Sequence, residues 1–210
     1  MVITVVLLAL GETGCEYSTP RAFATEGDAE RHLSQHLKQF TVLAGLWLSS
    51  GHSHLYWYGR SILGRELFTW SDYWVRPNWW TFEVMHWNGH EYIVDNVASL
   101  DDAARICGST RQEILGWHSQ LASLSIDMIS REIATRDATR FSYVEISFFP
   151  VLAPYGFRYA PPSDSVAQRE LKDLARQRPR RGIKMSDLGD GWFYFEGLWT
   201  GEDLPFKRVR

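Results

Sequence analysis

The dipeptide Asn88-Gly89 constrains the fold of this chain more than any other feature of its sequence. It lies between two segments rich in aromatic and β-branched residues, Trp79–Trp87 and His90–Val97. Asn and Gly tolerate the positive φ angles of a type I′ turn, and this turn matches the twist of two paired strands. The sequence therefore predicts a β-hairpin over residues 79–97.

The register of this hairpin decides which side chains share a face of the sheet. With a two-residue turn at Asn88-Gly89, the expected pairs are Trp87/His90, Met85/Tyr92 and Glu83/Val94 on one face, and His86/Glu91, Val84/Ile93 and Phe82/Asp95 on the other. Both faces carry apolar groups, so we expect both to be at least partly covered.

Several segments before the hairpin also suggest regular structure. Thr25-Glu-Gly-Asp28 is typical of a helix N-terminus, and the apolar spacing after it predicts an amphipathic helix over residues 26–39. Gly and Ser breaks then separate segments that we expect to be antiparallel strands, namely Phe40–Leu48, His54–Tyr58 and Leu67–Val75.

The second half of the chain predicts helices and a further hairpin. Ser99 caps a short helix that Gly108 ends, and Ser109 or Thr110 starts a long helix running to about Ala134. The remaining expected elements are a strand over Phe141–Phe149, a helix from Ser163 or Ser165 to about Gln177, and a hairpin of Ile183–Leu188 and Trp192–Glu196 through Asp190-Gly191.

These elements predict an α+β fold, in which a mainly antiparallel sheet of hairpins packs against a helical pair. At 210 residues the chain fits one ordinary domain, and we place that domain at residues 16–210, with a loose tail over the last thirteen residues. A formal net charge of −3 indicates no general attraction for nucleic acid or anionic lipid.

Tryptophan is unusually concentrated in this sequence, in which aromatic residues make up 14% of the chain. Five of the ten tryptophans fall between residues 70 and 87, and these are Trp70, Trp74, Trp79, Trp80 and Trp87. They could stand on an open sheet face and bind a protein or glycan partner, or they could be core and cross-strand pairs. Neighbouring residues on a regular strand point to opposite faces, so one of Trp79 and Trp80 should be accessible.

The first fifteen residues form an uncharged apolar segment that ends in Gly14-Cys15. Gly14-Cys15 resembles the end of a bacterial lipoprotein lipobox, which implies removal of residues 1–14 and acylation of Cys15. Glu12 stands where that pattern has an aliphatic residue, and no Lys or Arg precedes the apolar segment. The alternative is that Val2–Leu10 is a buried strand of a cytoplasmic protein.

Three pairs of histidines have spacings that could serve a metal site, namely His32/His36, His52/His54 and His86/His90. The best candidate ligand set is His52, His54 and His86 with Asp72 or Glu91, which would suit a metal-dependent hydrolase. Surface or half-buried histidines explain all three pairs equally well. We therefore expect no resident metal or cofactor.

Residues 99–118 resemble the helix-turn-helix of small bacterial DNA-binding modules. Ala104, Gly108 and Ile114 take the positions of its small residue, turn glycine and buried aliphatic residue, and Trp117 follows where an aromatic residue is common. The resemblance implies a cytosolic DNA-binding regulator. However, the expected second helix is about twice the usual length and begins with one cation, Arg111, so an ordinary helical hairpin fits as well.

One strongly basic segment follows, made of Arg169, Lys172, Arg176, Arg178, Arg180, Arg181 and Lys184. It suits a solvated helix end, and in a lipidated protein it could also touch anionic headgroups. No nucleophile elbow, P-loop or dinucleotide motif is present. The sequence thus favours a non-catalytic module of the cell envelope, lipid-anchored on the periplasmic face, that binds a protein or glycan partner through its tryptophans.

Overall fold

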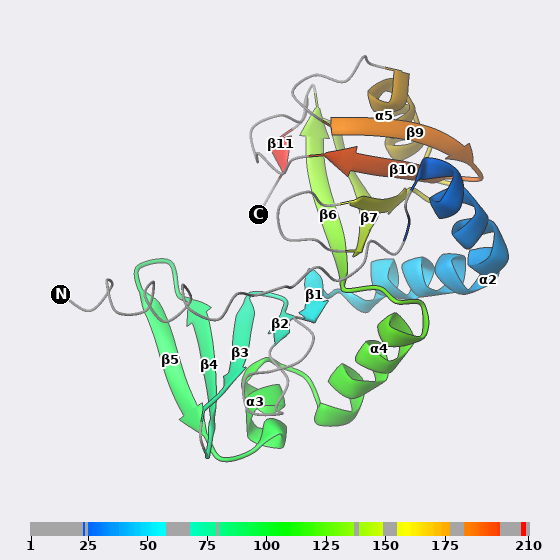
Figure 1. The fold of residues 1–210 in the computed structure, drawn as a ribbon. Coiled ribbons are helices and arrows are strands. Elements are labelled where there is room, and N and C mark those ends of the chain that lie inside the picture. The colour runs from blue at the N-terminus through cyan, green and yellow to red at the C-terminus, as the bar shows by residue number, and fades with distance from the viewer. Residues whose placement is uncertain are drawn as a thin grey trace, which may run out of the picture.

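The computed structural model describes residues 23, 25–57, 68–78, 80–136, 139–148, 155–176, 183–197 and 207–208. The expectations for Val2–Leu10, Cys15 and Trp79 lie outside these residues. The described helices are α2 (Glu26–Ser50), α3 (Leu100–Ile106), α4 (Arg111–Ser123) and α5 (Ser165–Arg176) (Figure 1). None of them is both long and apolar enough to span a membrane.

The strands form one antiparallel sheet, so the predicted α+β class is confirmed. Its strands are β1 (His54–Trp57), β2 (Phe68–Trp70), β3 (Tyr73–Pro77), β4 (Phe82–Trp87), β5 (Tyr92–Val97), β6 (Met128–Arg136), β7 (Thr139–Phe148), β8 (Tyr155–Tyr159), β9 (Ile183–Gly189), β10 (Trp192–Gly197) and β11 (Lys207–Arg208). Within the described residues their order is β5-β4-β3-β2-β1-β6-β7-β8-β10-β9, and β11 pairs with β6 beside this path.

Helices cover the two faces of the sheet unequally. Helices α2, α3 and α4 contribute to the larger core on one face, whereas α5 packs on the other. Side chains of β10 alternate between these two cores. Trp192 and Tyr194 lie in the larger core, and Phe193 between them lies against α5. The face opposite α2–α4 is therefore covered by α5 near one end of the sheet.

Helix α2 is longer than the sequence analysis predicted. Its N-terminus is the expected capping box of Thr25 and Asp28. The strand expected over Phe40–Leu48 is wrong, because α2 continues to Ser50 and ends where Gly51 takes a φ of 82°. The physical reason is helical spacing, since the buried residues of this stretch are Phe40, Leu43, Ala44 and Trp47.

Helix α4 is shorter than predicted. Thr110 caps it and Leu124 ends it, so the expected extension to Ala134 is wrong. Ser125 follows with a φ of 55°, a left-handed conformation that stops the helix. The β-branched residues Ile129 and Ile133 then pair with β7 as part of β6. The short helix α3, capped by Ser99, agrees with the sequence prediction.

The predicted hairpin of β4 and β5 is present, but its register differs by two residues. Trp87 pairs with Tyr92 and not with His90. Gly89, with a φ of 101°, is the first central residue of the turn, and the Asn88 amide donates to the Glu91 carbonyl at 3.1 Å. A shift of two keeps every side chain on its predicted face.

The second hairpin has the expected turn, since Asp190 and Gly191 both have positive φ angles, 49° and 86°. The strand expected over Leu67–Val75 is divided into β2 and β3 by a turn at Ser71, which has a φ of 53°. Of the expected tail, Lys207 and Arg208 form β11, and its other residues lie outside those described.

Candidate binding surface

The outer face of β3, β4 and β5 carries a continuous set of large apolar side chains. Strand pairing places Trp74, Met85 and Val94 in one row across the three strands, and Trp87 beside Tyr92 in the next. We call these five residues the aromatic surface. Trp74, Trp87 and Tyr92 are 54%, 52% and 65% exposed, and the Trp87 and Tyr92 ring centroids lie 5.0 Å apart. A solvated sheet face normally carries polar residues at these positions.

The opposite face of the same strands packs in the larger core. Val75 and Val84 are fully buried there with Ala103 and Ala104 of α3. Helix α3 contacts both β4 and β5. The aromatic surface is consequently held on regular strands backed by a packed helix, which fixes its side chains before any partner binds.

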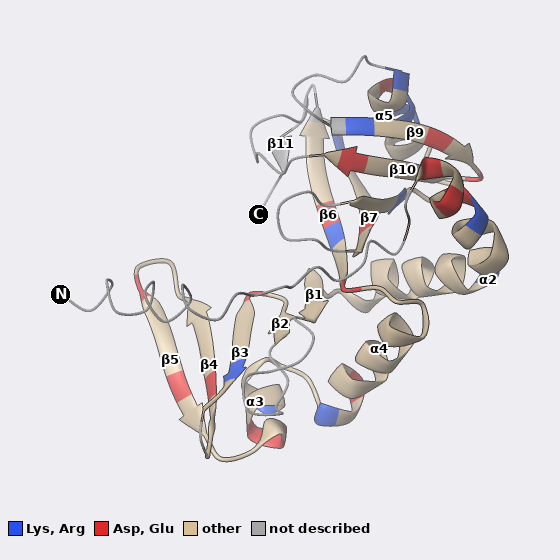
Figure 2. Ribbon diagram, in the orientation of Figure 1, with Lys and Arg blue, Asp and Glu red and all other residues tan. Residues whose placement is uncertain are grey.

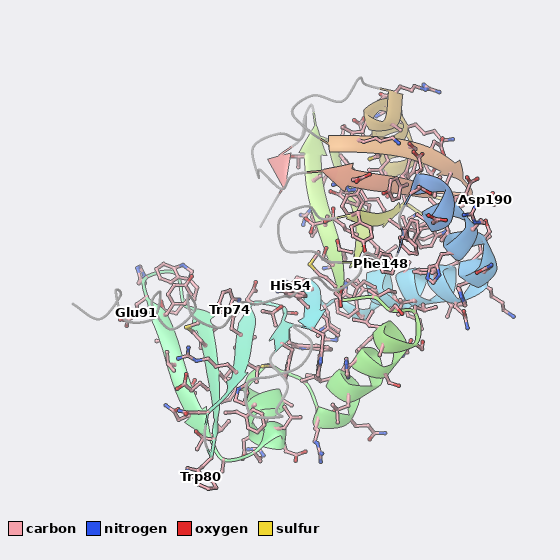
Figure 3. All side chains as sticks on the ribbon, in the orientation of Figure 1. His54, Trp74, Trp80, Glu91, Phe148 and Asp190 are labelled. Atoms are coloured by element: carbon pink, nitrogen blue, oxygen red, sulfur yellow. The ribbon has the colours of Figure 1, made fainter. Side chains whose placement is uncertain are left out.

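The structure divides the tryptophans that the sequence analysis grouped together. Trp74 and Trp87 belong to the aromatic surface. Trp70 does not, because it is fully buried and its ring meets the Trp47 ring edge-on at 6.2 Å. Trp80 is 83% exposed but lies in the β3–β4 turn, at the opposite end of the hairpin from Trp74 (Figure 3).

Trp80 does not lie on a regular strand, contrary to the expectation for Trp79 and Trp80. Strand β4 begins at Phe82, and Trp80 belongs to a turn closed by a bond from the Asn78 amide to the Thr81 carbonyl, 2.8 Å long. Trp79 lies outside the described residues. Alternation along a strand therefore does not apply to this pair.

Three members of the aromatic surface were missed by sequence reasoning, namely Met85, Tyr92 and Val94. The signal was present, because the predicted hairpin already places all three on the same face as Trp87, and strand pairing in the structure agrees. The hairpin register, even two residues off, would have identified the whole face.

The part of the sheet that carries the aromatic surface is rich in carboxylates. Arg76 and Glu83 form an ion pair across β3 and β4 on the same face. Over residues 68–107 the chain carries six carboxylates and two arginines. Figure 2 shows acidic residues on β4, β5 and α3 around this part of the sheet. Glu91, Asp95 and Asp101 form no salt bridge within the described residues.

The predicted metal ligands are not brought together. Within the described residues, no group of three His, Cys, Asp or Glu side chains could hold a metal ion. His52 Nε2 lies 3.0 Å from Glu113 Oε1, whose other oxygen accepts from the Ser109 hydroxyl at 2.7 Å. The Ser109 bond chiefly lowers the Glu113 pKa, with a further contribution from His52.

The other histidines occupy separate environments. Burial lowers the pKa of His54, and the nearby Asp72 carboxylate acts in the opposite direction. His86 lies against Tyr73, with ring centroids 5.0 Å apart. His32 and His36 have ring centroids 4.8 Å apart, and burial followed by repulsion from His36 lowers the pKa of His32.

The helical hairpin that resembles a DNA-binding module packs into the main core. Ile114 and Leu121 of α4 are fully buried, and Trp117 meets the Trp47 ring edge-on at 4.9 Å. Ile106 also packs against this core. Arg111 is the one Lys or Arg on α4.

The basic segment is partly neutralised where the structure describes it. On α5, Arg169 pairs with Glu170 and Arg176 lies 3.8 Å from Asp173. Lys184 of β9 pairs with Glu26 of α2. Residues 178–181 lie outside the described part of the chain. These contacts are those of a solvated helix and do not form an enclosed anion site.

A buried ion pair joins β7 and β8. Arg158 Nε lies 3.0 Å from Glu145 Oε2, and both side chains are almost completely buried. The guanidinium also lies over the Phe195 ring, 4.7 Å from its centroid. Such a pair holds neighbouring strands in register and would be costly to break on one side.

The aromatic surface is thus the best candidate for a functional site, and its chemistry is that of recognition. No family model, no curated protein and no solved structure matches this chain.

Proposed function

We propose that this protein is a non-catalytic binding module that docks a protein partner on its aromatic surface. The observation that carries the proposal is the half-exposure of Trp74, Trp87 and Tyr92 on strands whose other face is packed on α3. Large apolar patches on the surface of a protein tend to be interaction sites. Trp and Tyr are also the residues that contribute most binding energy in interfaces.

A protein partner fits this surface better than a glycan. Val94 and Met85 lie among the aromatic rings, and apolar neighbours of this kind suit the buried centre of a protein interface. A glycan would need free polar groups beside the rings to bind its hydroxyls. The charged side chains that strand pairing places on the same face of β3 and β4, Arg76 and Glu83, are already paired with each other. A glycan remains the second candidate ligand because Trp rings stack well on sugars.

The location that we propose is the cell envelope, with the protein anchored through a lipid on Cys15. Support comes from the sequence, where an apolar segment ends in Gly14-Cys15. A DNA-binding regulator is less well supported, since Arg111 is the one Lys or Arg that α4 offers for phosphate contacts. A metal-dependent hydrolase is also less well supported, because His52, His54 and His86 lie in separate environments.

Site-specific photo-crosslinking in the producing cells tests the proposal. Benzoylphenylalanine at Trp87 or Tyr92 should give an adduct with a polypeptide that mass spectrometry can identify. The same probe at Leu46 is the matched control, because that side chain of α2 is 48% exposed and apolar but lies away from the aromatic surface. The purified partner should then bind the Trp87→Ala variant about tenfold or more weakly.

Equal crosslinking at position 46 and at the aromatic surface would contradict the proposal. An adduct made of carbohydrate would favour the glycan alternative. Absence of any adduct at positions 87 and 92, with the protein folded and expressed at its natural level, would also count against a partner at this surface.

A further inference from the structure

Strand β5 stands at one end of the sheet, and no other described strand covers its outer edge. Within the described residues it pairs with β4 and with no other strand. The pairing runs from Tyr92 to Val97 without a register shift. An edge of this kind exposes a row of backbone N–H and C=O groups that can pair with another chain.

The opposite edge of the sheet, β9, is protected in ways that β5 is not. Lys184 and Asp187 place charges of both signs on β9, and Lys184 is tied to Glu26 of α2. The register between β9 and β10 also shifts beside Phe193. Charges and bulges are the devices by which natural edge strands avoid pairing. Strand β5 has no Lys, Pro or bulge, and Asp95 is its one charged residue.

The two faces of β5 differ in a way that specifies an incoming strand. Tyr92 and Val94 point to the aromatic surface. Asp95 pairs with the buried Val84 and so lies half-buried on the other face, toward α3, a helix whose first turn carries the exposed Asp101. A strand added beside β5 would place its alternate residues against these two faces.

We infer that β5 receives an extended segment of the partner polypeptide as an additional strand, with apolar residues beside Tyr92 and Val94 and lysine or arginine beside Asp95. The inference rests on the proposed function and names the form of the partner. Main-chain hydrogen bonds supply affinity in this mode of binding, and the alternate side chains supply specificity. Charge complementarity selects a basic segment, since residues 68–107 hold six carboxylates and two arginines.

The same charge disfavours a second copy of this chain as the occupant. Two β5 strands related by a twofold axis would bring two acidic regions together. The twofold register centred on Asp95 would also place two carboxylates directly opposite each other, which is destabilising.

Synthetic peptides added to the full chain test the inference. The first alternates Lys with Val or Tyr, the second has the same composition with its Lys residues in one block, and the third is the first with every backbone nitrogen methylated. We expect the alternating peptide to slow amide hydrogen exchange in β5 by about tenfold or more. The block and methylated peptides should bind at least about tenfold more weakly, because register and main-chain bonds are lost.

Charge variants of the protein supply a matched comparison. Asp95→Lys should weaken binding of the alternating peptide by about tenfold. Asp187→Lys makes the same charge change on the other edge strand and should leave binding of this peptide unchanged. Equal loss in both variants would show general attraction by charge and overturn the inference. Sedimentation velocity should find the free protein monomeric, and a dimer that Val94→Pro abolishes would identify a second copy as the occupant and overturn it too.

The outcomes separate this inference from the proposed function. If the methylated peptide binds as tightly as the parent and Trp87→Ala weakens both, the aromatic surface is a binding site and strand addition is wrong. If methylation abolishes binding and Trp87→Ala has no effect, strand addition holds and the role of the aromatic surface fails. If no peptide protects β5 at millimolar concentration, strand addition is overturned, and crosslinking at Trp87 still decides the proposed function.

Discussion

Trp87 and Tyr92 pair directly across the β4–β5 hairpin, and their rings meet at an interplanar angle of 61° while both remain more than half exposed. A tilted aromatic pair contributes about 0.5–1.5 kcal/mol beyond the area that it buries. On a solvated face this geometry fixes two large rings in one orientation. The pair therefore presents a preformed contact for a partner.

Replacing Trp87 by Ala should affect stability far less than replacing Trp70. Trp87→Ala should lower the free energy of unfolding by about 1–2 kcal/mol, since only about half of the side chain is buried and the ring contact that it loses is with Tyr92. Trp70→Ala should lower it by about 3–5 kcal/mol, because a fully buried ring leaves a cavity. Denaturant titration of both variants checks this, and equal large losses would show that Trp87 is a core residue.

Two glycines with positive φ angles allow a matched test of close packing. Gly89→Ala should cost about 1–2 kcal/mol, because φ is 101° and nothing lies within 4 Å of the added Cβ. Gly191→Ala should cost more, since that Cβ would lie 2.2 Å from the Ala160 carbonyl oxygen. Thermal melts of the two variants compare them directly. Similar losses would mean that the backbone at Ala160 moves aside easily.

Stability should fall as the pH drops below about 6.5, the ordinary histidine pKa. Burial lowers the pKa of His54. Burial is also the main cause of the lowered pKa of His32, and repulsion by His36 adds a smaller contribution. The unfolded chain then binds protons that the folded chain does not, so acidification favours unfolding until the folded pKa values are passed. Denaturant titration at pH 7 and pH 5.5 measures how much the free energy of unfolding falls on acidification. This fall should be smaller for His54→Gln than for the unchanged protein, and an equal fall would show that His54 is not its cause.

Processing at Cys15 can be checked by the intact mass of the protein purified from its own cells. We expect the loss of residues 1–14 and a mass increase from acylation of Cys15. Cys15→Ser should remain unacylated. A native mass that includes residues 1–14 and an unmodified cysteine would exclude a lipid anchor and leave the partner-binding proposal to be judged separately.

Local signals allowed part of the fold to be predicted from sequence. The caps at Thr25 and Ser99 act within one helical turn, so the chemistry of a few residues decides them. The turn at Asp190-Gly191 is equally local. The β4–β5 hairpin was predicted with its faces correct, because alternation survives a register error of two residues.

Other features depended on competing signals that sequence alone did not separate. The stretch Phe40–Leu48 has the aromatic content of a strand and the spacing of a helix, and the spacing prevailed because it matches one buried face of α2. The apolar residues between Ile126 and Ile133 fit the spacing of a helix and that of a strand. The positive φ of Ser125 ends α4 before them, and β6 follows. Composition was the weaker guide in both places.

The Glu145–Arg158 ion pair had no local signal at all. The two residues are thirteen positions apart, and they meet because β7 and β8 pair in that register. The division of the tryptophans was also missed, although its cause is local. Trp70 and Trp74 are four residues apart, but the turn at Ser71 places one in the core and the other on the surface.

The four-residue strand β1 links the two ends of the sheet energetically. Leu55, fully buried, lies opposite Trp70 of β2 on one side and Ile129 of β6 on the other. The larger core also continues from Val84 to Tyr194. The molecule should therefore melt in a single cooperative transition. A partner that binds only the folded β5 edge would then raise the melting temperature of the distant α5 and β9 as well.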